Sequence, residues 1–172
     1  MAMGAPGGGI RVARRHELRR LGEIEEASDQ LFTEVGIGPF RDEAEPGHLE
    51  RAAIVLVSGD PPLGFASVEI VDGAAHLSQL SVLPAASRRG LGAALLTAVC
   101  DWAAAQGYRA VTLTTFRDVS WNGPFYARMG FQVVDDLTPQ LAAIREHEKA
   151  IGDDDFGPRV AMRKDLGGAT SP

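Results

Sequence analysis

Residues 77–93 read Leu77-Ser78-Gln79-Leu80-Ser81-Val82-Leu83-Pro84, then two alanines, then Ser87-Arg88-Arg89-Gly90-Leu91-Gly92-Ala93. The first part predicts a strand that Pro84 ends, and the second part begins a helix predicted over residues 89–106. The first N–H groups of a helix are unpaired and carry the positive end of its dipole, and glycines there let an anion approach the backbone. This order of strand, turn and glycine-rich helix start predicts a site for pyrophosphate or another phosphate group.

The two arginines and two glycines of this turn allow either a phosphate-binding role or a purely structural one. Arg88 and Arg89 can add charge-assisted hydrogen bonds to a phosphate, whereas Gly90 and Gly92 could serve only the tight packing of helix against strand. The Gly-x-x-x-x-Gly-Lys-Ser/Thr string of a P-loop does not occur, and a Rossmann fingerprint would need glycine where Leu95 stands. The sequence therefore indicates a phosphate site for a different cofactor.

The rest of the chain alternates between strand and helix patterns. The Asp72-Gly73 pair is typical of a hairpin turn, so the strands on either side of it should belong to an antiparallel meander. We expect an α/β (α+β) fold with a mixed, mostly antiparallel central sheet and helices on both faces. One domain over 10–166 should lie between disordered tails at 1–9 and 167–172. The expected strands are 10–14, 52–57, 63–71, 75–83, 110–116, 131–134 and 159–163, and the expected helices are 18–32, 89–106, 120–129 and 139–149.

Composition narrows the class of ligand. The 172 residues carry a formal net charge of -6, which argues against nucleic acid as the main partner because that binding needs clustered Lys and Arg. The single cysteine, Cys100, suits a cytoplasmic location, and the four histidines show no metal-ligand spacing. No stretch resembles a signal peptide or approaches the roughly 20 apolar residues of a membrane helix. We therefore expect a cytoplasmic protein without a metal, membrane or nucleic-acid partner, and a homodimer is compatible with the sequence.

The turn is similar to a motif of the GNAT superfamily of acetyl-CoA-dependent N-acetyltransferases, which has the form Gln/Arg-x-x-Gly-x-Gly/Ala after a strand. The resemblance implies a GNAT-like acyl-CoA N-acyltransferase fold with acetyl-CoA as the acyl donor. Ser87 departs from the Gln or Arg of the motif but leaves the backbone positions intact. Main-chain groups of Leu80 to Val82 would hold the pantetheine arm and polarise the thioester. The cofactor-binding residues implied here are Leu80, Ser81, Val82, Ser87, Arg88, Arg89, Gly90, Leu91, Gly92 and Ala93.

A second match is Trp121-Asn122-Gly123-Pro124-Phe125-Tyr126-Ala127-Arg128-Met129-Gly130-Phe131. The family often shows a short helix ending in Tyr-x-x-x-Gly-Phe, whose tyrosine commonly faces the sulfur of coenzyme A. Tyr126 is the implied catalytic acid, because a phenol with a pKa near ~10 can donate to a thiolate whose conjugate acid has a pKa near ~8.5. Taken alone, Tyr126 could instead be a core residue with its hydroxyl at the edge. Asn122 either caps the helix or donates to coenzyme A.

Together the motifs imply direct transfer of an acetyl group from acetyl-CoA to a primary amine of a small molecule. Some family members place a glutamate base where Gln79 stands, so Glu69 and Asp118 are the candidate bases. Acetylation of a protein or peptide amine, a non-catalytic acyl-CoA sensor and an interaction module with a structural glycine turn are the alternatives. The acceptor pocket should come from segments 32–46 and 135–157. Within the latter, Asp153-Asp154-Asp155 should be a solvated loop or an attractant for a cationic substrate.

Overall fold

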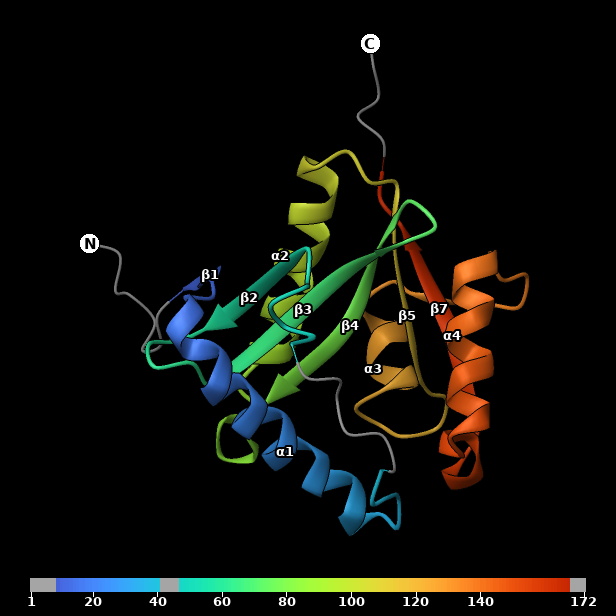
Figure 1. Cartoon of the computed structure of the whole chain (residues 1–172), viewed down its shortest axis with the longest axis horizontal. Helices are drawn as coiled ribbons and strands as arrows, with labels where there is room; N and C mark the ends of the chain where they lie inside the picture. The colour runs from blue at the N-terminus through green and yellow to red at the C-terminus, as the bar shows by residue number, and fades with distance from the viewer. Residues whose placement is uncertain (1–8, 41–46, 168–172) are drawn as a thin grey trace.

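The computed structural model describes residues 9–40 and 47–167, which form one seven-stranded sheet with the strand order β1-β2-β3-β4-β5-β7-β6. The strands β2, β3 and β4 follow one another directly, and helices that cover the two faces of the sheet separate the other strands (Figure 1). The predicted mixed sheet with helices on both faces is thereby confirmed. The strands are β1 (Ile10–Val12), β2 (Ile54–Ser58), β3 (Gly64–Val71), β4 (Ala74–Val82), β5 (Ala110–Phe116), β6 (Gln132–Val134) and β7 (Arg159–Asp165).

Two helices lie on each face of the sheet. In the view of Figure 1, α1 (Leu18–Glu34) and α4 (Pro139–Ala150) lie in front, whereas α2 (Leu91–Ala105) and α3 (Gly123–Arg128) lie behind. Three short 3-10 helices complete the chain: η1 (Arg15–Glu17), η2 (Pro84–Ala86) and η3 (Asp153–Phe156). The largest core cluster lies between the sheet and the helices α2 and α3. A smaller cluster lies between α1 and the strands β2 and β3.

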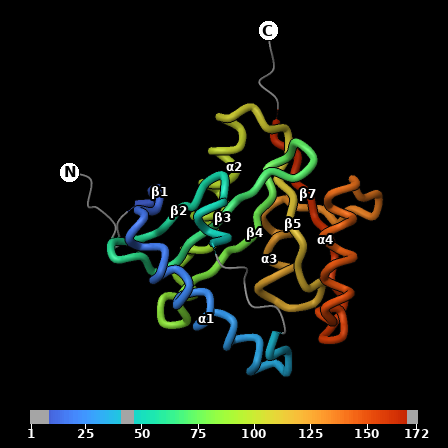
Figure 2. The backbone as a smooth tube through the Cα atoms, in the orientation of Figure 1, coloured from blue at the N-terminus to red at the C-terminus, as the bar shows by residue number. Residues whose placement is uncertain are grey.

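The strands β4 and β5 separate after a short contact, and this separation positions the site. They are the only parallel neighbours among the described strands, and they pair at Ala75↔Val111 and His76↔Thr112 alone. From Leu77 to Val82, β4 keeps its antiparallel partner β3 but has no strand on the other side, while β5 stays paired with β7 along its whole length. Figure 2 shows the two tubes diverging. The pairing of β3 with β4 skips Ser78, so a β-bulge marks the start of the free edge.

All the predicted strands and helices occur in the structure, but most of their boundaries differ by one to three residues. The helix expected from residue 120 begins at Gly123, where a side chain would collide with the carbonyl oxygen of Arg117. The run from Asp153 to Asp155, expected to be a solvated loop, begins η3; Asp155 is exposed, but Asp154 is half-buried and bound by Arg145. The predicted tails fall on residues 1–8 and 168–172, and part of segment 32–46 falls on 41–46; all three ranges lie outside the described residues.

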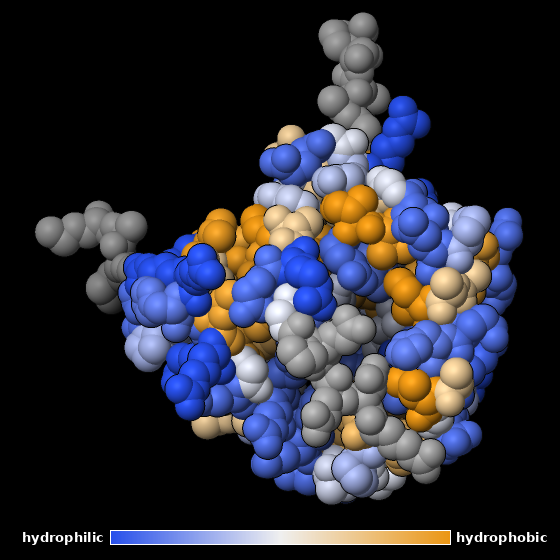
Figure 3. All heavy atoms as spheres, viewed as in Figure 1, coloured by the Kyte–Doolittle hydropathy of each residue, from blue (hydrophilic) through white to orange (hydrophobic). Residues whose placement is uncertain are grey.

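Hydrophilic side chains dominate the face that carries α1 and α4, and apolar residues appear there in separate patches (Figure 3). The large apolar side chains most exposed to solvent are scattered along the chain; they are Val12, Val35, Ile70, Trp121 and Val133. Within residues 9–40 and 47–167, no helix is both long and apolar enough to cross a membrane.

Candidate active site

A cleft of about 860 Å³ opens where β4 and β5 separate. Its lining residues come from both faces of the sheet, and we name its two sides by their helices. The α2 side comprises the free edge of β4, residues 86–93 and residues 122–128; the α1 side comprises the lining residues of α1, α4, β7 and η3, with Phe40, Glu69, His76, Thr114, Phe116 and Trp121.

The turn before α2 has the backbone that its glycines predict. Gly90 occupies the N-cap position of α2 with φ 78°, a left-handed conformation that favours glycine, and Arg88 has φ 63°. Ser87 closes the preceding turn by donating its Oγ hydrogen to the carbonyl of Pro84 at 2.7 Å. The residues from Leu91 to Ala93 line the cleft, and their N–H groups are among those that a helix cannot pair internally. The α2 side therefore presents unpaired donors and the positive end of a helix dipole to the cleft.

Gly92 shows that packing does not explain both glycines of the turn. A Cβ at this position would meet only Phe125, at 3.9 Å, which is an ordinary contact, and the residue has no left-handed backbone. A Cβ at Gly90 would meet nothing within 4 Å. The alternative in which the glycines permit tight packing of helix against strand is therefore wrong. The space beside Gly92 belongs to the cleft.

The free edge of β4 supplies a second set of backbone groups. Leu80 and Val82 line the cleft, whereas the Ser81 side chain is buried and its Oγ accepts a hydrogen bond from Gln79. Main-chain N–H and C=O groups along this edge have no partner strand, so an extended ligand could pair with them as a strand would. Of the predicted cofactor-binding residues, Ser81 and Arg89 do not line the cleft with their side chains, and the others do.

Tyr126 lies at the wall of the cleft with its ring in the core. It is 7% exposed and makes edge contacts with Phe125 and Phe131, whose ring centroids are 5.2 and 5.8 Å away. Burial raises the pKa of its hydroxyl above the usual range, so the group stays protonated at neutral pH. This hydroxyl makes no hydrogen bond to any described residue. The core interpretation therefore holds for the ring, and the role of the hydroxyl as an acid stays a prediction.

Asn122 stands at the N-cap position of α3 but does not cap it through its side chain. Its Nδ2 donates to the carbonyl of Trp121 at 3.1 Å, and the residue lines the cleft. The capping interpretation is therefore wrong in its usual side-chain form. A role toward a ligand stays a prediction.

Polar side chains line the sheet on the α1 side. His76 is 3% exposed, and its Nδ1 lies 2.8 Å from Thr112 Oγ1 at the last rung between β4 and β5. Burial lowers the pKa of His76 to about 4, so the imidazole is neutral at physiological pH. Glu69 lies opposite His76 in the β3–β4 pairing and also lines the cleft. Directly opposed residues of antiparallel strands share a face, which places these two side chains together.

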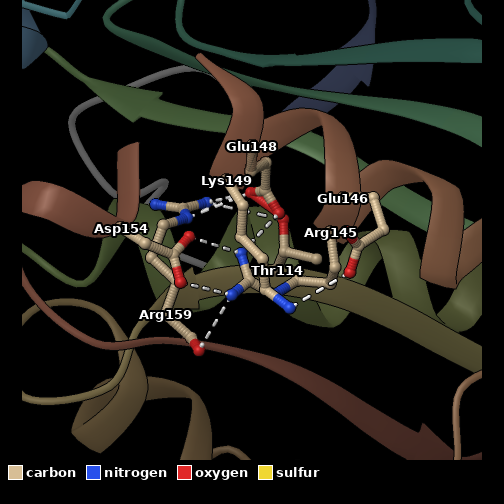
Figure 4. Close-up of polar contacts among 7 residues, drawn as sticks. All are labelled: Thr114, Arg145, Glu146, Glu148, Lys149, Asp154 and Arg159. Atoms are coloured by element: carbon tan, nitrogen blue, oxygen red, sulfur yellow. Dashed lines mark hydrogen bonds and ion pairs between the residues drawn. The ribbon is translucent and has the colours of Figure 1, made fainter. Parts of the chain in front are cut away.

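A buried ion-pair network between α4, β5, β7 and η3 borders the α1 side of the cleft (Figure 4). Glu148 of α4 accepts hydrogen bonds from Arg159 of β7 at 2.7 Å, from Thr114 of β5 at 3.0 Å and from Arg145 at 3.2 Å. Arg145 also binds Asp154 at 2.7 Å, which holds the pKa of that carboxyl below its usual value. The Arg159 guanidinium lies 4.5 Å from the centroid of the Phe116 ring. These contacts satisfy Glu148, so it is poorly suited to accept a proton from a substrate.

The candidate bases differ in whether they line the cleft. Gln79 uses its amide to donate to Ser81 and cannot act as a base. Asp118 does not line the cleft; it is exposed and ion-paired with Arg117 at 2.9 Å, which lowers its pKa. Glu69 alone of the two candidates reaches the cleft.

Several cleft residues did not emerge from the sequence. They are Glu25 and Asp29 of α1, His76 and Arg159; Glu148 lies within the expected pocket segment 135–157 but was not singled out. Glu148 could have been found, because it continues the apolar stripe of Leu141 and Ile144 at helical spacing, and a carboxylate on such a stripe requires a buried partner. The α1 carboxylates give no such signal, since charged residues surround them in the sequence. Within the described residues, no group of three or more His, Cys, Asp or Glu side chains could hold a metal ion.

The sheet that opens between two parallel strands, with a helix N-terminus facing the opening, defines the class of acyl-CoA N-acyltransferase folds. A sequence model described as the acetyltransferase (GNAT) family matches residues 11–131, which is more than half of the chain. The chain belongs to this family and is an acyltransferase.

Solved structures support the fold over nearly the whole chain. N-acetylglutamate synthase from Neisseria gonorrhoeae, complexed with coenzyme A and N-acetyl-glutamate, superposes with a TM-score of 0.70 at 20% identity. That match covers 96% of this chain but only 36% of the synthase. The paia N-acetyltransferase from Thermoplasma acidophilum, in complex with coenzyme A, gives 0.65 at 18% identity over 94% and 99% of the two chains. Arabidopsis thaliana Naa50, with the bisubstrate analogue CoA-Ac-MVNAL, gives 0.64 at 16% over 93% and 99%.

Proposed function

We propose that this chain transfers an acetyl group from acetyl-CoA directly to a primary amine of a small molecule. In this proposal residues 10–166 form one N-acetyltransferase domain of a cytoplasmic enzyme. The observation that carries the proposal is one cleft bordered by both the unpaired backbone edge of β4 and the open N-terminus of α2 at Gly92. Coenzyme A offers a pyrophosphate and an extended amide-containing arm, and these two features match that pair of surfaces.

In this proposal, each part of acetyl-CoA lies against a particular part of the cleft. Phosphates would lie at Leu91 to Ala93 with Arg88 beside them, and the pantetheine arm would pair with the β4 edge near Leu80 and Val82. The neutral amine attacks the thioester carbonyl, a C–N bond forms, the C–S bond breaks and the amine loses one proton. Backbone N–H groups near the Ser78 bulge would stabilise the oxyanion.

Tyr126 would assist the departure of sulfur. Because its pKa lies above that of a thiol, hydrogen-bond donation to the thiolate is favoured over complete proton transfer. Glu69, alone or through a water molecule, is the group we propose to remove the proton from the amine, since it reaches the cleft beside His76.

Ligand binding and turnover test the proposal separately. Acetyl-CoA and free coenzyme A should raise the melting temperature and NAD should not, because only ligands of the native state stabilise it. The absence of any change with acetyl-CoA would remove the donor assignment. Thiol release over an amine panel then tests catalysis. Binding without thiol release would favour an acyl-CoA sensor, and release with peptides alone would favour a protein or peptide acceptor.

A further inference from the structure

Two carboxylates on the α1 side of the cleft have no cationic partner among the described residues. Asp29 and Glu69 make no ion pair with any described residue, and Glu25 has only His48, whose Nε2 lies 3.4 Å away. Burial and the nearby Glu25 raise the pKa of Asp29 to about 6. Two partly desolvated carboxylates held close together on one helix are unfavourable until a cation joins them.

The arginines on this side are already occupied. Arg159 donates both Nε and Nη2 to Glu148, and Arg145 divides its guanidinium between Glu148 and Asp154 (Figure 4). The two arginines and two carboxylates of this network balance each other in charge. Among the described residues, the α1 carboxylates therefore leave the acceptor end of the cleft negative, and a negative charge on the acceptor would be repelled there.

Aromatic rings stand beside these carboxylates. Phe32 lies 5.4 Å from both Phe40 and Trp121, and 5.7 Å from Phe116, measured between ring centroids. All four rings line the cleft. Aromatic faces attract alkylammonium groups and accommodate the methylene chains that carry them. Arg159 already uses the Phe116 ring in this way.

His76 adds an independent sign of a nitrogen ligand. The side chain is 3% exposed and lines the cleft, yet Nε2 has no partner among the described residues. With Nδ1 engaged by Thr112, a neutral imidazole can accept an N–H of an amine through Nε2. His76 precedes Ser78 by two positions in β4, and the thioester is proposed to bind at the Ser78 bulge.

We infer that the acceptor carries a second positive charge, as a diamine or polyamine does, and that Glu25, Asp29 and the aromatic rings hold this charged end. The neutral amine at the other end then reaches the thioester beside His76. This inference rests on the proposed function and names its acceptor class.

Three four-carbon amines test the inference because they differ only at the far end. These are 1,4-diaminobutane with a cation, n-butylamine with a methyl group and 4-aminobutanoate with an anion. Thiol release should give a kcat/KM for the diamine roughly 10- to 100-fold above that of n-butylamine, as expected for a charge-assisted contact, and the lowest value for 4-aminobutanoate. Equal values for the diamine and n-butylamine, or a preference for 4-aminobutanoate, would overturn the inference.

Substitutions on α1 show whether its carboxylates set this preference. Asp29→Asn and Glu25→Gln should each raise KM for the diamine about tenfold relative to KM for n-butylamine, with a much smaller change in kcat for the diamine. Glu23→Gln on the exposed side of the same helix is the matched control and should change nothing. A diamine preference that survives in Asp29→Asn combined with Glu25→Gln would contradict the assignment.

Calorimetry separates the inference from the proposed function. The diamine should bind the protein–coenzyme A complex and n-butylamine should bind far more weakly, whether or not any turnover occurs. Diamine binding without thiol release would leave the inference standing and defeat the transferase proposal. Thiol release with n-butylamine, without measurable diamine binding, would do the reverse.

Discussion

The two sides of the cleft are built from different kinds of groups. The α2 side offers backbone: the free edge of β4 and the unpaired N–H groups at Leu91 to Ala93. The α1 side offers side chains from separate segments, including Asp29, His76 and Glu148. Backbone sites suit a ligand portion that is the same in every reaction, whereas side chains set which second substrate fits. Under the proposed function, the backbone groups would hold the donor and a separate surface would select the acceptor.

The largest expected effect falls on the α2 side. Gly92→Glu should weaken acetyl-CoA binding by at least about 100-fold, because a carboxylate would occupy the open space and repel the phosphates. Ala94→Glu, two residues further on an exposed position of α2, is the matched control and should bind normally. Calorimetry measures both. Equal affinity for the two variants would show that the phosphates bind elsewhere.

On the α1 side, the largest effect should be on stability. Glu148→Gln removes the charge that Arg159 and Arg145 share and leaves both guanidinium groups partly unpaired in a buried site, at a cost of roughly 3 kcal/mol. Glu146→Gln on the same helix affects an exposed pair with Lys149 and should cost well under about 1 kcal/mol. Urea unfolding compares the two. Similar losses would mean that the network contributes little.

Tyr126→Phe should lower kcat roughly 10- to 100-fold with unchanged acetyl-CoA affinity, because only the hydrogen bond to the departing sulfur is lost. The ring contacts with Phe125 and Phe131 remain, so the melting temperature should stay near that of the wild type. Tyr108→Phe, outside the cleft and beside Trp102, is the control. Full turnover by Tyr126→Phe would disprove the acid role.

The smallest effect concerns pH and Asp29. The pKa of Asp29 is about 6 in the folded protein and near 3.8 in the unfolded chain. Between pH 3.8 and about pH 6, the folded state therefore binds more protons than the unfolded state. The contribution of Asp29 to stability is therefore present below pH ~4 and is lost as the pH rises through ~6. Asp29→Asn should gain stability over the wild type at pH 8, by less than about 1 kcal/mol after solvent screening, and none near pH 4. Melting curves at both values, with Glu23→Gln alongside, measure this; a gain that is equal at both values would contradict the assigned pKa.

Local patterns explain why the α2 side could be predicted from the sequence. Pro84 ends a strand, Gly90 takes a left-handed backbone and the apolar repeat after it forms a helix, all within one short stretch. Each of these features depends on neighbours in the chain, so the residue types reveal them. The order of these elements followed from the same kind of signal, and their boundaries followed to within three residues.

The α1 side depends on contacts between distant segments and could not be predicted in the same way. Asp29 and Glu69 line the same cleft only because α1 packs across β3 and β4, and nothing near either residue in the sequence marks them. The expected pocket segments do supply Phe32, Phe40 and Glu148, but the carboxylates of α1 and the histidine of β4 were missed. The ion pair of Asp154 was not expected, because its partner Arg145 lies nine residues earlier, in α4.

The most direct test of the account is to count both products of one reaction. The protein, acetyl-CoA and 1,4-diaminobutane are incubated together, and the free thiol and the acetylated diamine are quantified in the same sample. Direct transfer predicts equal amounts of the two, growing together with time and absent with Gly92→Glu. Free thiol without acetylated diamine, or neither product while acetyl-CoA binds, would contradict the account.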